Sequence, residues 1–551
     1  MGPAHQQGEA SVSTKWTNQD STTIPHLLQA ACAKWPDKVF LDFIGERYTY
    51  KDVDHETTRL AHGLAALGVR KGDRVCSMLG NVADLIFVWF AINKLGAVSV
   101  PINFDFKGEY LRHQIADSGA KIIVAEEQYA ERVFAIENGT PELTTLVTRG
   151  ARAEGQSRLE LMTLDQLKSE DTTPIPISVI PDDLALLIYT SGTTGPSKGC
   201  MVGHAYACNF GRENAITTTM TADDVMYTPC PLFHAAAAFG VVISALVVGG
   251  AAAIGARFSV SNFWPDIEQS KATMVMLLSI MLRLIPDAPD TEVSRRCFGQ
   301  IRVLFGAPFP PALKAQWKER FGVKHPATPG YGMTEACPIF VYPCDKDGAP
   351  PTASGRRYDG YETRIIGDDG NECAPNVPGE IVLRPGKPGN MFQGYWRRPD
   401  ATVEAWRDLW FHTGDIGKID ENGFFYFLDR KKDYLRRGGE NISSFEVEAT
   451  FLSHPDVAEV AVHSVPSELG EDELKVTVVL RPGVDLTEDK LCIWSFDRLP
   501  QFCIPRYIEF REALPKTQAS LRTQKHILRS EGVTAGTWDR QKAGIAVPKR
   551  R

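Results

Sequence analysis

The sequence has 551 residues, of which 60 are Lys or Arg and 68 are Asp or Glu, so its formal charge at neutral pH is −8. With 43% hydrophobic and 23% charged residues, it has the composition of an ordinary globular protein, and its length allows several domains with large cores. A mildly acidic chain without a long basic run is a poor nucleic-acid binder, so no nucleic-acid partner is expected.

The 11 cysteines include no CxxC pair and no His/Cys cluster at zinc-ligand spacing. Such a set indicates free thiols in a reducing compartment, and a cytoplasmic location is expected. Residues 1–23 are polar and lack the apolar stretch of a secretory signal. They are expected to form a disordered tail.

Residues 237–256 are uncharged over the length of a membrane-spanning helix. The stretch is rich in Ala, Gly and Val, however, and Gly249-Gly250 interrupts it. It therefore predicts a buried helix, a glycine turn and a buried strand over 251–254, in a soluble protein without a membrane span.

The N-terminal half alternates between helical and extended patterns. Helices are expected over 52–67 and 82–95, each followed by a glycine, and strands over 74–79, 97–100 and 121–125. Strands that alternate with helices in this way predict parallel sheets with helices on both faces.

From about residue 355 the pattern changes to short strands and tight turns, such as Asn422-Gly423 between two apolar runs, which predict antiparallel hairpins. The last part of the chain predicts a small α+β unit. Its strands are expected over 457–464 and 475–480, and its helices over 446–452 and 489–499.

The most distinctive local pattern is the string LIYTSGTTGPSKG at 187–199, which is rich in glycine and hydroxyl groups and begins in an apolar run. Glycines permit tight turns, so backbone N–H groups and hydroxyls can surround phosphate oxygens, and Lys198 supplies positive charge. The order of residues differs from that of the GxxxxGK[ST] loop. A different kind of phosphate-binding loop is predicted.

This string resembles the phosphate loop of the adenylate-forming (AMP-binding) superfamily, which includes acyl-CoA synthetases, luciferases and peptide-synthetase adenylation domains. Three further motifs follow in that family's order: YGMTE at 331–335, WFHTGD at 410–415, and DRKKD at 429–433 with RGGENI at 437–442. The resemblance extends over roughly residues 25–530 and indicates the acyl-CoA synthetase/ligase type.

The resemblance implies an α/β fold. A large N-terminal domain of parallel α/β subdomains with a small β-barrel-like subdomain would be followed by a small mobile α+β C-terminal domain. The implied boundaries are 24–429 for the AMP-binding domain and 430–535 for the mobile domain, with a tail at 536–551. Lys432 would be the hinge, and Gly438-Gly439 would line the CoA tunnel, where glycine lets the backbone approach a thin ligand closely.

The same resemblance assigns roles in ATP binding and catalysis. Thr194 and Lys198 of the phosphate loop and Thr334 of YGMTE would contact phosphate. The carboxylate of Glu335 would hold Mg²⁺, a hard cation that prefers oxygen ligands. Asp415 would accept hydrogen bonds from both ribose hydroxyls, and Arg430 would clamp a phosphate or the ribose. Further nucleotide-binding positions are implied at Thr190, Ser191, Gly192, Thr193, Gly195, Gly306, Ala307, Pro308, Tyr331, Gly332, Met333 and Thr334.

The acyl pocket is implied near residues 231–234, 306–308 and Gly332. His234 matches the aromatic or His position that lines this pocket in the family, although a core histidine with a satisfied hydrogen bond is the simpler alternative. The small side chains of residues 235–238 indicate room for a bulky or flat acyl group.

One motif departs from the family pattern. The family's C-terminal motif reads Pro-Lys-Thr, two residues, then Gly-Lys, and its last Lys contacts the acid and ATP; here residues 515–525 read PKTQASLRTQK. Counting forward places Leu521 at the lysine position, and counting back places Arg522 there. Arg522 is the favoured substitute because a guanidinium can hold an oxyanion bidentately. Alternatively, Lys516 or Lys525 swings in, or the first half-reaction is altered toward an unusual oxyacid.

The predicted activity is ATP-dependent conversion of a carboxylic acid to an acyl-adenylate with release of pyrophosphate, then transfer to the thiol of CoA. ATP, Mg²⁺ and CoA are the expected cofactors, with a small-molecule acid or oxyacid as the other partner. Three alternatives stay open: a diazotase that adenylates nitrite and passes it to an aromatic amine, a protein-bound acyl acceptor, and a non-catalytic nucleotide-binding homologue.

Overall fold

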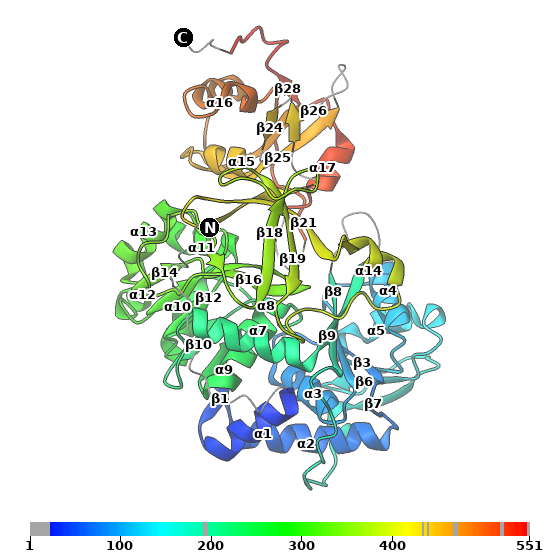
Figure 1. Cartoon of the computed structure of the whole chain (residues 1–551). Helices are drawn as coiled ribbons and strands as arrows, with labels where there is room; N and C mark the ends of the chain where they lie inside the picture. Colours follow the sequence, from blue (N-terminus) through cyan, green and yellow to red (C-terminus); the bar gives the residue numbers. More distant parts are fainter. Residues whose placement is uncertain are drawn as a thin grey trace, which may run out of the picture. The chain divides into compact units, whose positions relative to one another are not determined.

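The computed structural model describes residues 23–190, 197–431, 435–437, 440–442, 444–466, 472–517 and 523–547. The chain divides into two compact units (Figure 1). The first comprises Met1–Thr363 with Arg384–Leu409, and the second comprises Arg364–Leu383 with Trp410–Arg551.

The first unit contains two seven-stranded sheets, one in the order β7-β6-β5-β3-β4-β8-β9. Its neighbouring strands pair in parallel except β8 and β9, which form an antiparallel hairpin. The parallel arrangement expected from the alternating pattern is thus confirmed. The strands are β3 (Arg74–Met78), β4 (Val98–Pro101), β5 (Ile122–Glu126), β6 (Thr145–Arg149), β7 (Glu160–Thr163), β8 (Leu184–Thr190) and β9 (Lys198–Gly203).

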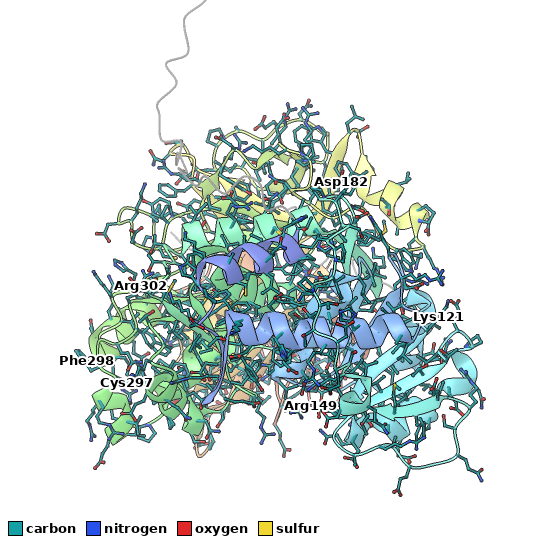
Figure 2. All side chains as sticks on the ribbon, turned by 90° about the horizontal axis from the view of Figure 1, so that it is seen from below. Lys121, Arg149, Asp182, Cys297, Phe298 and Arg302 are labelled. Carbon is teal, nitrogen blue, oxygen red and sulfur yellow. The ribbon has the colours of Figure 1, made fainter. Side chains whose placement is uncertain are left out.

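The second seven-stranded sheet has the order β14-β13-β12-β10-β11-β1-β2 and is parallel apart from the β1–β2 hairpin. Figure 2 shows the two sheet regions side by side, with Lys121 and Arg149 on the first and Phe298 and Arg302 on the second. The strands are β1 (Val39–Phe43), β2 (Glu46–Thr49), β10 (Val225–Thr228), β11 (Ala251–Ile254), β12 (Met274–Met276), β13 (Val303–Phe305) and β14 (His325–Ala327).

Helices pack on these sheets. They include α1 (Ile24–Lys34), α2 (Tyr50–Ala66), α3 (Ala83–Lys94), α4 (Gly108–Ser118), α7 (His204–Thr217), α10 (Val260–Ser270), α11 (Ser279–Asp287) and α13 (Pro311–Phe321). The helix expected over 52–67 is α2. It begins earlier because Thr49 and Asp52 form a reciprocal capping box around its first turn.

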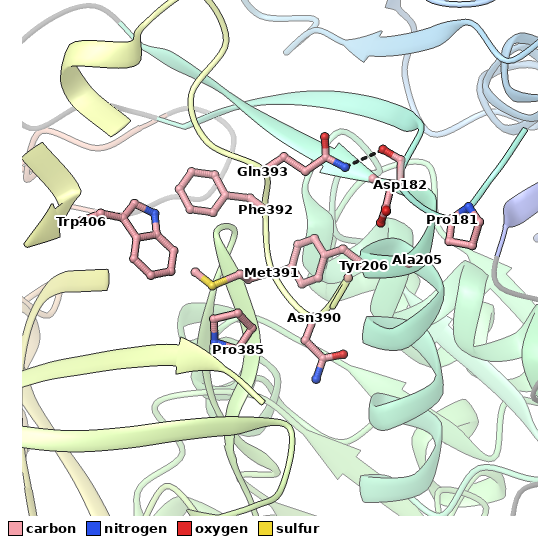
Figure 3. Close-up of a pocket in the computed structure, with 12 residues that line it drawn as sticks. Pro181, Asp182, Ala205, Tyr206, Pro385, Asn390, Met391, Phe392, Gln393 and Trp406 are labelled. Carbon is pink, nitrogen blue, oxygen red and sulfur yellow. Dashed lines mark hydrogen bonds between the residues drawn. The ribbon is translucent and has the colours of Figure 1, made fainter. Parts of the chain in front are cut away.

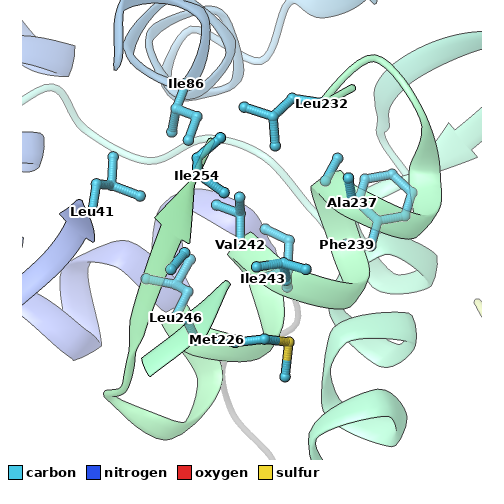
Figure 4. Close-up of a cluster of buried hydrophobic side chains, with 14 of the residues drawn as sticks. Leu41, Ile86, Met226, Leu232, Ala237, Phe239, Val242, Ile243, Leu246 and Ile254 are labelled. Carbon is cyan, nitrogen blue, oxygen red and sulfur yellow. The ribbon is translucent and has the colours of Figure 1, made fainter. Parts of the chain in front are cut away.

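The uncharged stretch 237–256 is buried in the core of the first unit, as predicted. It forms helical turns over Ala238–Ile243 and α9 (Ser244–Val248), then turns at Gly249, whose φ of +76° favours glycine, and enters β11. Figure 4 shows side chains of this stretch packed with Leu41 and Ile86. Within the described residues, no helix is both long and apolar enough to cross a membrane.

The second unit contains antiparallel hairpins followed by a small α+β sheet, as the sequence predicts. Strands β19 (Gly379–Pro385), β21 (Trp410–Ile419) and β22 (Phe425–Arg430) pair in that order, and the turn containing Asn422-Gly423 joins β21 to β22. The C-terminal sheet consists of β25 (Val457–Pro466), β26 (Asp472–Leu480), β27 (Tyr507–Phe510) and β28 (Trp538–Asp539), with helices α15 (Ser444–Leu452), α16 (Glu488–Ser495) and α17 (Lys525–Glu531).

Two features of the second unit differ from the expected boundaries. Residues 410–429 group with the C-terminal part of the chain, and Ser444 on α15 donates its N–H to Asp429 Oδ2 on β22 at 2.8 Å, so compactness does not divide the chain at residue 430. The described part of 536–551 is not a free tail: β28 pairs with β27, and Asp539 forms an ion pair with Arg506 at 3.3 Å. Two paired residues give too short a pattern to predict from sequence.

Buried His463 predicts a pH dependence of stability. Burial of the imidazole on β25 lowers the pKa of His463 to about 4 and outweighs the opposing effect of the Ser464 carbonyl, which lies 3.2 Å from Nδ1. The unfolded chain therefore binds this proton at a higher pH than the folded chain does. Unfolding free energy is expected to fall as pH drops from about 6.5 to 4, with a contribution from His463 of about 3 kcal/mol.

In urea unfolding over pH 4–7, His463→Gln is expected to flatten this decline by about that amount, whatever its effect at pH 7. His55→Gln, at a half-exposed position, serves as the control and should leave the slope unchanged. Equal slopes for wild type and His463→Gln would contradict the prediction.

Candidate active site

The hairpin of β8 and β9 presents the predicted phosphate loop. Thr190 pairs with Lys198 at the end of the hairpin that the loop connects. The loop residues Ser191, Gly192, Thr193, Thr194 and Gly195 lie outside the described residues. Helix α4 anchors both sides: the Tyr189 hydroxyl donates to Asp117 at 2.6 Å, and His113 Nε2 lies 2.8 Å from the Ser197 carbonyl. The loop thus begins and ends on firmly held backbone.

The YGMTE motif forms the tight turn between β15 (Gly330–Met333) and β16 (Ala336–Val341), with Thr334 and Glu335 at the turn. The Tyr206 hydroxyl donates to the Thr334 carbonyl at 3.0 Å. Gly332 is required by packing, because a Cβ there would lie 2.5 Å from the sulfur of Cys337. The Glu335 side chain is buried at this turn.

A third segment, residues 391–396, joins these two motifs. Its backbone pairs with β9 through Met201 N–H to the Gly394 carbonyl at 2.9 Å and Trp396 N–H to the Gly199 carbonyl at 2.8 Å. At its other end, Phe392 N–H donates to the Glu335 carbonyl at 2.9 Å. The phosphate-loop hairpin and the Glu335 turn are therefore held in one backbone network.

The start of this segment also lines a pocket of the first unit. Figure 3 shows Met391, Phe392 and Trp406 around the pocket, with Gln393 donating from Nε2 to the Asp182 carbonyl at 2.6 Å. This side-chain bond holds the segment in addition to its backbone contacts with β9 and Glu335.

Tyr395, on the same segment, lies between two predicted functional side chains. Its hydroxyl donates to Glu335 Oε1 at 2.8 Å, and the Lys198 ammonium lies 4.2 Å from the centre of its ring. Burial raises the pKa of Glu335, and the hydrogen bond from Tyr395 opposes that rise. Tyr395 lies outside the recognised motifs and was not predicted. The one signal in the sequence was the aromatic pair Tyr395-Trp396 after Gly394, a glycine that the structure explains by its φ of +119°.

The segments expected at the acyl pocket follow the carboxyl ends of parallel strands in the second sheet, where ligands bind in open α/β sheets. Gly306 directly follows β13, and a Cβ there would lie 2.2 Å from the Leu277 carbonyl oxygen. The 230–234 segment follows β10 and is tied down by Asn81, whose Nδ2 donates to the Cys230 carbonyl at 3.0 Å and whose Oδ1 accepts from Leu232 N–H at 3.0 Å.

His234 is enclosed, and its Nε2 has no hydrogen-bond partner among the described residues. Burial lowers its pKa to about 4, so the ring is neutral near pH 7. Its ring centroid lies 4.6 Å from that of Phe233, which in turn packs on Phe104 with 5.7 Å between ring centroids, so an aromatic ring borders the imidazole on one side. The simpler alternative, a core histidine with satisfied hydrogen bonds, does not describe this side chain.

The small residues after His234 do not all face open space. Ala237 and Ala238 are fully buried in the hydrophobic core, whereas Ala236 is exposed. Ala235 is buried there as well, so the four-alanine run gives less room for an acyl group than the sequence pattern indicates: three of its side chains are packed into the core.

In the second unit, the predicted ribose and clamp residues are cross-strand neighbours. Asp415 on β21 pairs with Arg430 on β22, and the Arg430 Nε lies 3.7 Å from Asp415 Oδ1. Nearby, Glu380 Oε2 contacts Lys431 at 2.9 Å and His412 at 3.2 Å. Burial alone would raise the pKa of Glu380, but Lys431 and His412 outweigh burial and hold it below its usual value.

The candidates for the missing catalytic lysine divide into two groups. Arg522 and Leu521 lie outside the described residues, as do Lys432, Gly438 and Gly439. Lys516 forms an ion pair with Glu459 at 2.7 Å, and Lys525 forms one with Glu448 at 2.7 Å. Either lysine would have to break a half-buried ion pair before it could swing toward a substrate.

Comparison with known proteins decides the family. Residues 28–396 match the AMP-binding enzyme family, and residues 446–520 match the AMP-binding enzyme C-terminal domain. The chain belongs to the AMP-binding enzymes. It is 33% identical over 474 residues to a feruloyl-CoA synthase from Amycolatopsis sp, a match that covers 86% of this chain and 92% of the relative.

Two further AMP-binding enzymes are similar to this chain over most of its length. A crotonobetaine/carnitine–CoA ligase from Proteus mirabilis is 31% identical over 498 residues, covering 87% of this chain and 93% of the relative. An O-succinylbenzoate coenzyme A synthetase from Bacillus subtilis, solved with ATP and magnesium ion, superposes with a TM-score of 0.76 at 27% identity, covering 92% of this chain and 98% of that structure.

The chain is accordingly an adenylate-forming ligase of the acyl-CoA synthetase type, as the motifs predict. Such enzymes activate acids as acyl-adenylates and transfer them to CoA. The diazotase alternative is not favoured, since these relatives are CoA ligases.

Proposed function

We propose that this enzyme is an aromatic acid:CoA ligase in which Lys198 and Glu335 of the first unit serve the phosphates and Mg²⁺ of ATP. For Asp415 and Arg430 of the second unit, we propose the ribose and clamp roles that the family resemblance implies. The observation that carries the assignment of the phosphate site is the Lys198–Tyr395–Glu335 arrangement beside the phosphate-loop hairpin. Support for an aromatic acid comes from the aromatic pair Phe233 and Phe104, of which Phe233 borders His234, and from the similarity to feruloyl-CoA synthase.

Glu335 fits the role of Mg²⁺ ligand. Mg²⁺ is usually bound by one or two carboxylates together with the phosphate oxygens of the nucleotide, and Glu335 is a buried carboxylate that Tyr395 holds through one oxygen. Bound there, Mg²⁺ would neutralise charge on the phosphates. Lys198 and the hydroxyls of the 190–194 segment would contact the phosphates from the hairpin.

The proposed reaction consists of two transfers. A carboxylate oxygen of the acid attacks the α-phosphorus of ATP, and the bond to pyrophosphate breaks as the acyl-adenylate forms. The sulfur of CoA then attacks the acyl carbonyl carbon, and AMP leaves. Fixed positive charge and N–H donors lower the barrier of the first transfer because they meet charge that develops on phosphate oxygens.

The remaining predicted residues serve binding and the change between half-reactions. Neutral His234 would orient the acid through its unpartnered Nε2. Rotation about Lys432 would bring Gly438 and Gly439 to the pantetheine arm of CoA, so that one site performs both steps.

The test is pyrophosphate release from MgATP with a panel of hydroxycinnamic, benzoic and aliphatic acids, each with and without CoA. The expected result is release with aromatic acids and a thioester mass that appears only when CoA is added. Release with aliphatic acids alone would overturn the aromatic assignment. Nucleotide binding without release for any acid would point instead to the non-catalytic alternative, and release without a thioester to a different acceptor.

Asp415→Asn is expected to lower kcat/KM for ATP about 100-fold, because a charged acceptor contributes roughly 1.5–3 kcal/mol to each hydrogen bond with the ribose. Wild type should prefer ATP to 2′-deoxy-ATP, and the variant should lose that preference. Asp420→Asn is the matched control, since Asp420 lies in the same hairpin and accepts from Tyr426 at 2.8 Å. Unchanged nucleotide discrimination in Asp415→Asn would contradict the ribose assignment.

A further inference from the structure

Tyr395 separates two opposite charges. Its ring faces the Lys198 ammonium at 4.2 Å, while its hydroxyl binds Glu335 Oε1 at 2.8 Å. Among the described residues there is no direct ion pair between Lys198 and Glu335, although Lys198 is close enough to favour the ionised form of Glu335 and so to lower its pKa. One side chain thus binds both groups at once and lies between them.

The position of Tyr395 is fixed by its backbone rather than by these two contacts. Tyr395 forms an antiparallel bridge with Cys200 on β9, and its N–H donates to Thr402 Oγ1 at 2.9 Å. Four residues earlier, Met391 forms a bridge with Ala336, next to Glu335. The segment therefore sets the distance between the phosphate-loop hairpin and the Glu335 turn.

Direct pairing would disable both charges. A buried Lys–Glu pair neutralises itself, since each ion is the other's strongest partner in a low-dielectric site. An aromatic face attracts an ammonium without supplying a negative charge. The Tyr395 phenol and the Cys200 thiol are neutral donors, so they satisfy the Glu335 carboxylate without cancelling its charge.

We propose that Tyr395 is a positioning residue that holds Lys198 and Glu335 apart at a fixed distance, so that both stay available to the phosphates and Mg²⁺ of ATP. This inference rests on the proposed roles of Lys198 and Glu335. It goes beyond them because it assigns a function to a residue that need not touch the substrate.

The test uses calorimetric titration of ATP with and without Mg²⁺, which requires no acid and no turnover. In Tyr395→Phe the ring still holds Lys198, so the Mg²⁺-free Kd for ATP should stay within about twofold of wild type. The Mg²⁺ concentration at which half of the Mg²⁺-dependent change in the Kd for ATP is reached should rise about 10-fold. This is the usual consequence of losing one hydrogen bond to a charged group. In Tyr395→Leu the Mg²⁺-free Kd should rise about 10-fold as well, because Lys198 and Glu335 can then pair.

Tyr227→Phe is the matched control. Tyr227 is a buried tyrosine of the same unit whose hydroxyl also donates to a carboxylate, Asp266, at 2.8 Å. The substitution Tyr227→Phe should lower thermal stability but change neither the Mg²⁺-free Kd for ATP nor its Mg²⁺ dependence. If Tyr395→Phe keeps the wild-type Mg²⁺ dependence, the inference is overturned, and this result can be obtained even when Tyr395→Leu does not fold. Absence of pyrophosphate release with every acid would instead count against the proposed function.

Discussion

Replacing Glu335 by Gln is expected to reduce pyrophosphate release by about 10²–10³-fold, the usual loss when one preorganised electrostatic contact to a transition state is removed. The amide can still accept the Tyr395 hydrogen bond, so the shape of the turn should persist, but a neutral oxygen binds Mg²⁺ far less well than a carboxylate does. The loss should persist at high Mg²⁺, measured as initial rates over a magnesium series with one acid held at saturation.

The same substitution should not lower thermal stability. Burial raises the pKa of Glu335, which means that the folded protein holds the ionised carboxylate at a cost, and Gln removes that cost. An activity loss without a loss of melting temperature would separate a functional carboxylate from a structural one.

Asp266→Asn provides the control for Glu335→Gln. Burial also raises the pKa of Asp266, and this side chain also accepts a hydrogen bond from a tyrosine at 2.8 Å, but it lies outside the predicted site. It should change stability little and leave pyrophosphate release unchanged. Wild-type release by Glu335→Gln at saturating Mg²⁺ would contradict the assignment.

The parts of the fold that could be predicted are those with strong local patterns. The buried strands around 74–79 and 121–125 and the helix that became α2 depend on apolar spacing and on capping residues next to them in the chain. The hairpin turn at Asn422-Gly423 depends on two residues with a strong turn preference. Each of these signals is contained within a few neighbouring residues.

The elements that were missed depend on contacts between distant residues. Strand β28 exists because Trp538 and Asp539 pair with β27, and a two-residue strand carries no period of its own. The inward orientation of Ala237 and Ala238 depends on the core that surrounds them. The grouping of 410–429 with the C-terminal part of the chain likewise depends on contacts between separate segments, such as the bond from Ser444 N–H to Asp429.

The candidate site shows the same division. Motifs located Lys198, Glu335, Asp415 and Arg430, because each lies in a recognisable string. Tyr395 escaped detection because its importance comes from two partners that are far away in the sequence, and only the fold brings them together. The sequence likewise could not predict that Nε2 of His234 lacks a hydrogen-bond partner, since this depends on all the groups that the fold places around the ring.

Arg522→Ala is expected to slow adenylation by about 10²–10³-fold while changing thioester formation from a supplied acyl-adenylate by less than about threefold. The family's lysine at this place contacts the acid and ATP only in the first half-reaction, and Arg522 is the proposed replacement. Arg522→Lys should retain much of the adenylation rate, because it keeps the charge although it loses the bidentate geometry. Pyrophosphate release and thioester formation, measured separately, distinguish the two half-reactions.

Lys516→Ala and Lys525→Ala decide between the alternatives for this role. Lys516 pairs with Glu459, whereas Lys525 is bound by both Glu448 and Ser444, so each already has a structural function in the second unit. Loss of either pair should lower stability more than it lowers adenylation. If Arg522→Ala releases pyrophosphate at the wild-type rate and one lysine variant does not, that lysine takes the place of the missing residue. The ion pair of that lysine would then have to open during each catalytic cycle.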